Sequence, residues 1–256
     1  MKNANTILSY IQRQVTIGSK MFAVLIDPDK QNEESLLKTI HQCNQSDVDF
    51  FFVGGSIVNH NDMDKTVRTI KENTLKPVII FPGHPEQISK HADAILFLSL
   101  TSGRNPEFLI GHHVTAAPVI SSTNLEVIPT GYLLVDCGTT TTAIYVSDTN
   151  PIPYENSSIA ANTALAGEYL GLKMTYIDGG SGAKKCISEE MISKTRSVIN
   201  GPLIIGGGIR SVQKAQEIFK AGADIIVVGN GAETNLDLIP EIADMKHALN
   251  TNILST

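Results

Sequence analysis

The chain has 256 residues, and its 20 basic and 26 acidic side chains give a formal charge of −6. Hydrophobic residues make up 42 % and charged residues 18 %, which provides enough apolar side chains for a core and excludes general disorder. The acidic balance and the lack of a Lys/Arg-rich block argue against nucleic acid as a partner.

Eight short apolar segments, rich in Val, Ile, Leu and Phe, recur along the chain, and most of them end in Gly or Asp. Nearly continuous apolar character without alternation is typical of strands buried on both faces, as in a parallel sheet. The sequence therefore predicts strands at residues 21–27, 48–55, 77–83, 94–100, 131–138, 174–180, 202–208 and 223–230.

Helix-like stretches lie between these strands. Ser188 and Ser211 stand where N-caps are expected, and Asn105 before Pro106 indicates another helix start. We expect helices at residues 33–43, 105–118, 156–171, 188–200 and 211–223. Eight strands alternating with helices predict a TIM-type (β/α)8 barrel, and single barrels of this kind run to roughly 250 residues. A single domain over residues 1–256 is therefore expected.

The spacing of the predicted elements has two irregularities. The third and fourth strands begin at residues 77 and 94, which leaves roughly a dozen residues between them, barely enough for a crossover helix. We therefore predict that the third helix is replaced by a loop or a short turn, leaving one side of the barrel open. Residues 139–155 form a long polar excursion after the fifth strand.

The last three strands end in glycine-rich segments, at residues 176–183, 206–210 and 229–233. Glycines let backbone N–H groups approach an anion closely, and the loops after strands seven and eight of such barrels commonly hold phosphate. Tight turns between strands and helices are the alternative for any single loop. Three such loops together favour a phosphate monoester ligand.

The first two strands end in candidate metal ligands. Asp27 lies at the end of the first strand, and Ser56 follows the second. Magnesium prefers hard oxygen ligands and keeps much of its water, so a carboxylate and a hydroxyl at one barrel end suit it. The alternative is that Asp27 caps the following helix, with Pro28 fixing the turn.

Other candidate groups are weaker. His112 and His113 are adjacent in a predicted helix and point to different faces, so packing roles are expected for both. Arg104 could bind an anion, and Cys137 follows a strand-end aspartate without a His or Asn at recognisable spacing. The sequence has no P-loop, dinucleotide fingerprint or Ser-His-Asp signature, which disfavours hydride transfer and kinase chemistry.

The cysteines and the N-terminal segment indicate in which cellular compartment the protein is expected. Cys43, Cys137 and Cys186 show no metal-ligand spacing, and an odd number makes a disulfide framework unexpected. The first 14 residues lack the apolar core of a signal peptide, and no stretch of about 18 apolar residues occurs. We expect a cytoplasmic protein with no transmembrane segment.

Taken in order, the motifs resemble one family. LIDPDK (25–30), FFVGGS (51–56), IIFPG (79–83), SLTSGRNPEFLIGHHV (99–114), YIDGGSGA (176–183), GGGIR (206–210) and VVGN (227–230) are similar to the PcrB-like family of geranylgeranylglyceryl phosphate synthases. The resemblance covers about residues 20 to 245 and looks like the second group of the family. That family is also known for a barrel that lacks its third helix.

The resemblance implies a Mg²⁺-dependent prenyltransferase. Family members join sn-glycerol 1-phosphate to a prenyl diphosphate, here geranylgeranyl diphosphate, through an ether bond and release diphosphate. Carried over by motif, Asp27 and Ser56 would hold the magnesium. Glycerol 1-phosphate would be bound by Tyr176, Ile177, Asp178, Gly179, Gly180, Ser181, Gly182, Gly207, Gly208, Gly229 and Asn230.

Two positions depart from the family pattern. Asp178, the expected catalytic group for orienting or deprotonating the glycerol hydroxyl, stands where many relatives carry glutamate; a loop-bracing carboxylate is the alternative. Leu25 stands where some relatives have a phosphate-binding lysine. We expect the prenyl tail to leave through the open flank, near Phe81, Phe97 and Leu98.

Two other functions remain open from the sequence. One is another phosphate-binding barrel enzyme, an isomerase or synthase of amino-acid, thiamine or nucleotide metabolism, and the other is a non-catalytic phosphate- or lipid-binding barrel. The resemblance further implies a homo-oligomer, a dimer or hexamer. A lipid substrate and product imply transient contact with membrane surfaces.

Overall fold

A computed structural model describes residues 6–56 and 63–253. Eight parallel strands pair in chain order and close on themselves, with β1 hydrogen-bonded to β8. The predicted barrel is therefore confirmed. The strands are β1 (Met21–Ile26), β2 (Phe50–Val53), β3 (Val78–Ile80), β4 (Ala94–Leu100), β5 (Glu126–Leu134), β6 (Met174–Asp178), β7 (Leu203–Gly206) and β8 (Ile225–Val228).

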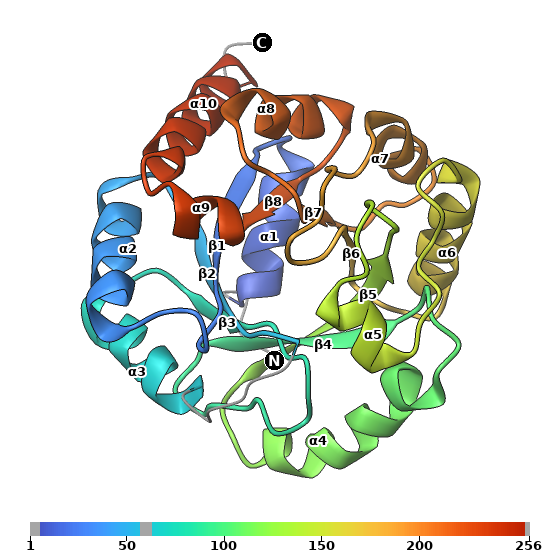
Figure 1. Cartoon of the computed structure of the whole chain (residues 1–256), viewed down its shortest axis with the longest axis horizontal. Helices are drawn as coiled ribbons and strands as arrows, with labels where there is room; N and C mark the ends of the chain where they lie inside the picture. The colour runs from blue at the N-terminus through green and yellow to red at the C-terminus, as the bar shows by residue number, and fades with distance from the viewer. Residues whose placement is uncertain (1–5, 57–62, 254–256) are drawn as a thin grey trace.

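Helices form an outer layer around this sheet (Figure 1). Ser188 and Ser211 are N-caps as predicted, since their hydroxyls accept hydrogen bonds from the N–H groups of Met191 and Lys214. The helices are α1 (Ile7–Thr16), α2 (Glu33–Gln45), α3 (Met63–Asn73), α4 (His112–Ser121), α5 (Thr142–Ser147), α6 (Ser157–Tyr169), α7 (Glu189–Arg196), α8 (Val212–Ala221), α9 (Asn230–Thr234) and α10 (Leu238–Ile253), and a π-helical turn, η1 (Glu107–Gly111), leads into α4.

The connection from β3 to β4, residues 81–93, contains no helix, as the spacing predicted. The sheet itself stays closed there, because Ile79 and Ile80 of β3 pair with Ala94 and Ile95 of β4. What is missing is one segment of the outer helical layer, between α3 and α4 (Figure 1). The predicted open side is therefore a gap in the helices and not in the sheet.

Several elements differ from the sequence prediction. The strand expected at 131–138 begins at Glu126, because Pro129 is accommodated inside β5 opposite Phe97. Residues 142–147 of the polar excursion form α5, which Thr141 caps by accepting a hydrogen bond from the N–H of Ile144. Helices α1, α3, α9 and α10 also lie outside the helical stretches that the sequence predicted.

Helix α1 lies at the end of the barrel where the strands begin. The N–H groups of Ile7 and Leu8 donate to the carboxylate of Glu126, the first residue of β5. Ile11 is fully buried and belongs to the same apolar cluster as Phe50 and Phe52 inside the barrel. Because α1 covers this end, the opposite end, where the strands terminate, is the one available to ligands.

Among the residues that the structure describes, no helix combines the length and the apolar character that crossing a bilayer requires.

Candidate active site

A polar cavity of about 440 Å³ lies at the end of the barrel where the strands terminate; we call it the mouth. Its walls come from the ends of β1, β2, β6, β7 and β8, so Asp27 and the glycine-rich loops share one cavity. Of the predicted site residues, those that line the mouth are Asp27, Ser56, Tyr176, Asp178, Gly180, Ser181, Gly182, Gly207, Gly208, Gly229 and Asn230.

Two residues from the predicted glycerol phosphate segment do not line the mouth. Ile177 is fully buried in the apolar cluster between the sheet and its helices, because successive side chains of β6 point to opposite faces. Gly179 lies beneath the loop, where an added Cβ would come within 2.9 Å of the Cys137 sulfur. Both residues therefore pack beneath the loop and do not contact the mouth.

Glycine is required at Gly207 by its surroundings. Its φ of +86° is one that other residues rarely adopt, and an added Cβ would lie 2.7 Å from the backbone nitrogen of Gly179. The loops after β6 and β7 therefore approach each other closely. Helix α9 begins directly after β8 beside these loops, an arrangement that barrels commonly use for phosphate.

Asp178 is buried at the floor of the mouth, with both carboxylate oxygens hydrogen-bonded. The hydroxyl of Tyr132 donates to Oδ2 at 2.7 Å, and the N–H of Gly180 donates to Oδ1 at 2.7 Å. Burial raises the pKa of Asp178, while these two hydrogen bonds act to lower it. The pKa of Tyr132 is also raised, by burial and by the adjacent carboxylate, so its hydroxyl stays protonated as the donor.

Three aromatic rings form a wall at the centre of the mouth. Phe81 stacks on Tyr176 with ring centroids 5.2 Å apart, and Tyr132 packs edge-on against both at 5.6 and 5.5 Å. Phe81 and Tyr132 also line a second cavity on the other side of this wall.

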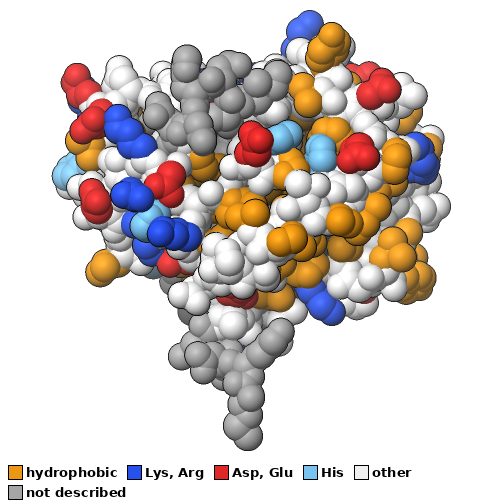
Figure 2. All heavy atoms as spheres, turned by 90° about the horizontal axis from the view of Figure 1, so that it is seen from below, with side chains coloured by type: hydrophobic (Ala, Val, Ile, Leu, Met, Phe, Trp, Pro, Cys, Tyr) orange, Lys and Arg blue, Asp and Glu red, His pale blue; other side chains and the backbone are white. Residues whose placement is uncertain are grey.

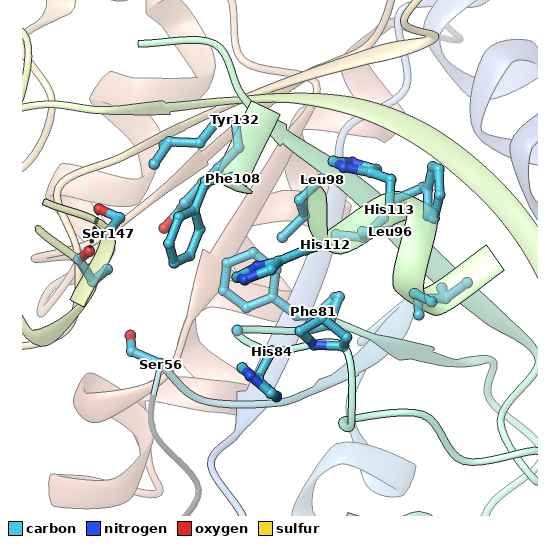
Figure 3. Close-up of a pocket in the computed structure, with 18 of the residues that line it drawn as sticks. Ser56, Phe81, His84, Leu96, Leu98, Phe108, His112, His113, Tyr132 and Ser147 are labelled. Carbon is cyan, nitrogen blue, oxygen red and sulfur yellow. Dashed lines mark hydrogen bonds between the residues drawn. The ribbon is translucent and has the colours of Figure 1, made fainter. Parts of the chain in front are cut away.

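That second cavity, which we call the apolar pocket, lies at the gap in the helical layer. Phe81, Phe97 and Leu98, the residues expected near the prenyl groove, all line it. Figure 3 shows side chains from the β3–β4 connection, η1 and α4 facing this space. The remaining walls include Ala116 and Ile120 of α4 and Ala143 and Val146 of α5.

The two adjacent histidines both lie at this pocket. His113 is buried and packs edge-on against Phe97 with ring centroids 4.4 Å apart, which agrees with the predicted packing role. His112 packs against Phe108 and His84 (Figure 3). Burial and the neighbouring His84 lower the pKa of His112, so its ring is uncharged at neutral pH and suits an apolar surrounding.

Asp27 and Ser56 fit a magnesium site by their chemistry and surroundings. An added Cβ at Gly55 would lie 2.9 Å from Oδ1 of Asp27, so this glycine lets the end of β2 approach the carboxylate. The described residues contain no group of three His, Cys, Asp or Glu side chains that could hold a metal by themselves. A carboxylate and a hydroxyl that leave positions for water and ligand phosphate match Mg²⁺ rather than Zn²⁺.

Several mouth residues were not singled out from the sequence. Lys30 forms a salt bridge with Asp27 at 2.9 Å, and half-buried Glu233 has its pKa raised by burial, with Asp27 adding to the shift and Lys30 opposing it. Tyr132 was missed because its role depends on the pairing of β5 with β6, which places it beside Asp178. Arg104, by contrast, is exposed, and its guanidinium donates to the carbonyl of Gly103 rather than facing the mouth.

Comparison with known proteins agrees with this geometry. A model of the PcrB family matches residues 15–246. A Chitinophaga pinensis protein named geranylgeranylglyceryl phosphate synthase is 51 % identical over 240 residues, covering 94 % of this chain and 95 % of that protein.

Solved structures show the same likeness. The (S)-3-O-geranylgeranylglyceryl phosphate synthase of Thermoplasma acidophilum, solved with sn-glycerol-1-phosphate, is 32 % identical with a TM-score of 0.87, covering 98 % of this chain and 100 % of that chain. The Thermoplasma volcanium enzyme is 38 % identical with a TM-score of 0.88, covering 95 % and 98 %. With the family model matched over most of its length and with relatives this similar, the chain belongs to the PcrB family.

Proposed function

We propose that this chain is a prenyltransferase that joins sn-glycerol 1-phosphate to geranylgeranyl diphosphate through an ether bond. The observation that carries this proposal is the shared wall of Phe81 and Tyr132, which puts a polar mouth directly beside an apolar pocket. A reaction between a phosphate ester and a lipid diphosphate needs both environments to meet at the reacting atoms. The named relatives, one of them solved with sn-glycerol-1-phosphate, support this choice of substrates.

The glycine-rich loops would bind the glycerol phosphate. Ser181, Asn230 and the glycines of the loops after β6, β7 and β8 line the mouth together, and glycine lets backbone N–H groups approach an anion closely. Holding the phosphate there fixes the glycerol hydroxyls near Asp178 at the floor. Fixing the reacting hydroxyl in this way replaces a random encounter by an oriented contact.

The bond changes follow from this placement. The glycerol hydroxyl oxygen forms a bond to the allylic carbon, the bond from that carbon to the diphosphate oxygen breaks, and the hydroxyl proton passes to Asp178. Each carboxylate oxygen of Asp178 has a lone pair left beyond its hydrogen bond to Tyr132 or Gly180. The faces of the aromatic wall carry partial negative charge, which favours the cationic character that develops on the allylic carbon.

Magnesium dependence is part of the proposal. Asp27 and Ser56, which follow β1 and β2, would hold the ion in the same mouth that the glycine-rich loops line. When bound, Mg²⁺ supplies Lewis-acid stabilisation of the negative charge on the diphosphate leaving group. Asp27 and the carboxylate of Asp178 at the floor therefore have different tasks, metal binding and proton transfer.

The test is incubation of the purified protein with labelled sn-glycerol 1-phosphate, geranylgeranyl diphosphate and Mg²⁺, with mass analysis of the extracted lipid. The proposal expects a lipid of the mass of the ether product, lost on addition of EDTA and regained with excess Mg²⁺. Binding of both substrates without product would indicate a non-catalytic barrel. Neither binding nor product would indicate another barrel enzyme, and both results contradict the proposal.

We further infer a cytoplasmic homo-oligomer, a dimer or hexamer, that contacts membrane surfaces transiently. Three free cysteines support a reducing compartment. Figure 2 shows apolar side chains gathered on one face of the molecule, and Ile110 of η1 and Val114 and Val119 of α4 are exposed, which supplies apolar surface for such contacts. Light scattering after size-exclusion chromatography tests the oligomer, and sedimentation with vesicles tests the membrane contact.

A further inference from the structure

Lys30 lies between Asp27, the candidate metal ligand, and Ser181 in the glycine-rich loop after β6. The Lys30 ammonium is 2.9 Å from Oδ2 of Asp27, and it donates a hydrogen bond at 3.1 Å to the hydroxyl of Ser181. Ser181 in turn donates to Oδ1 of Asn230 at 2.9 Å. A single lysine therefore contacts the expected metal ligand and the expected phosphate loop at the same time.

The charges that line the mouth make this lysine unusual. Of the described residues in its walls, Asp27, Asp29, Asp178 and Glu233 are acidic, and Lys30 and Arg210 are basic. Two cations against four acids leave a formal charge of 2 − 4 = −2 if all are ionised. A cavity with this balance repels phosphate ligands unless a cation is added or rearranged.

The second basic side chain of the mouth, that of Arg210, is held by a hydrogen bond to the backbone. The guanidinium of Arg210 donates to the carbonyl oxygen of Ala183 at 2.7 Å, which holds it against the loop. The side chain of Lys30 is 40 % exposed and ends a flexible four-carbon stem, so its ammonium can move without disturbing the core. Lys30 is therefore the mouth cation that is free to exchange partners.

We propose that Lys30 is a substrate-binding residue that neutralises Asp27 until the metal binds and then pairs with the phosphate of glycerol phosphate above Ser181. This inference rests on the proposed function. A divalent ion and an ammonium repel each other at one carboxylate, so the arrival of the metal releases Lys30 from Asp27. The hydrogen bond that Lys30 already makes to Ser181 sets the direction of its movement.

Because Lys30 exchanges Asp27 for the phosphate, the binding of Mg²⁺ and the binding of glycerol phosphate affect each other. Because the metal frees the ammonium that the phosphate uses, Mg²⁺ strengthens glycerol phosphate binding, and glycerol phosphate strengthens Mg²⁺ binding by the same factor. Removing the ammonium has opposite effects on the two ligands taken singly. It removes a competitor of Mg²⁺ at Asp27, and it removes a partner of the phosphate.

The experiment measures binding by titration calorimetry rather than turnover, with Lys30→Met as the main variant. Mg²⁺ alone is titrated into the protein, and sn-glycerol 1-phosphate is titrated with and without Mg²⁺. Lys30→Arg keeps the charge, and Lys38→Met removes an exposed lysine of α2 that pairs with Glu34 and lies outside the mouth. Circular dichroism melting checks that each variant is folded.

We expect Lys30→Met to bind Mg²⁺ several-fold more tightly than the parent chain when no phosphate ligand is present. Its affinity for sn-glycerol 1-phosphate in Mg²⁺ should fall roughly 10- to 100-fold, as for the loss of a hydrogen bond to a charged group. The factor by which each ligand raises the affinity of the protein for the other should decrease. Lys30→Arg should retain most of the phosphate affinity, and Lys38→Met should behave as the parent chain.

Three results would overturn the inference. Unchanged affinities in Lys30→Met would show that Lys30 contacts neither ligand. Weaker binding of both Mg²⁺ and glycerol phosphate would show a merely structural role. If Lys30→Met fails to fold, the same opposed changes must appear in Lys30→Gln, and their absence there counts against the inference. A parent chain that does not bind sn-glycerol 1-phosphate contradicts the proposed function instead, whereas the Mg²⁺ titration still tests the pairing with Asp27.

Discussion

Replacing Tyr132 by Phe tests whether Asp178 is the proton acceptor. The change removes one oxygen atom and with it the 2.7 Å hydrogen bond to Oδ2 of Asp178. The ring remains, so its packing against Phe81 and Tyr176 is preserved. Because the hydrogen bond stabilises the ionised carboxylate, its loss raises the pKa of Asp178 further, in the same direction as burial.

The size of the effect follows from the chemistry of this contact. A hydrogen bond to a charged group contributes about 1.5–3 kcal/mol. Since 1.4 kcal/mol corresponds to about a factor of ten, the ionisation constant of Asp178 should fall roughly 10- to 100-fold in Tyr132→Phe. At pH values where Asp178 is the group that limits activity, kcat/KM should fall by the same factor. At higher pH the variant and the parent chain should converge.

The assay is the pH profile of kcat/KM, which reports the ionisation of the free enzyme. The acid limb of Tyr132→Phe should move to higher pH. Tyr176→Phe is the matched control, since it removes a hydroxyl from the same wall, and the structure shows Tyr132 rather than Tyr176 donating to Asp178. An acid limb at the same pH in a folded Tyr132→Phe would refute the role of Asp178 as the base.

Three other changes test the apolar pocket, the loops and the buried carboxylate. Ala116→Trp should shorten the prenyl chain that the enzyme accepts, because Ala116 is 8 % exposed and lines the apolar pocket; exposed Ala117→Trp is its control, and equal product lengths would contradict the placement. Gly207→Ala should weaken glycerol phosphate binding and cost at least about 1–2 kcal/mol of unfolding free energy, from its left-handed backbone and the 2.7 Å approach to Gly179; an unchanged melting temperature would disprove this. Asp178→Asn should abolish activity and raise the melting temperature at neutral pH. Burial raises the folded pKa of Asp178, so the folded state binds its proton more tightly and loses stability as pH rises from the unfolded pKa through the folded one. Asparagine cannot ionise, so the gain should vanish at acid pH, and a gain that persists there would argue against this cause.

Much of the fold could be predicted because its signals are local. Continuous apolar runs such as 202–208 and 223–230 mark strands covered on both faces, and N-cap serines such as Ser188 mark helix starts. The 17 residues between the third and fourth strand starts leave barely enough chain for a crossover helix, so the gap in the helical layer could be predicted from chain length. The full extent of β5 could not be predicted, because the pairing of Pro129 with Phe97 depends on a neighbouring strand.

The sequence by itself determined which residue types stand at the strand ends: the carboxylate of Asp27, the hydroxyl of Ser56 and the glycines of the last three loops. Only the tertiary structure decided how they meet. Tyr132 reaches Asp178 across 46 positions of the chain, and Lys30 reaches Ser181 across 151, because barrel closure brings distant strand ends to one rim. Periodicity and spacing carry no information about such contacts, since these depend on which strands are neighbours and on the direction in which each side chain leaves its strand.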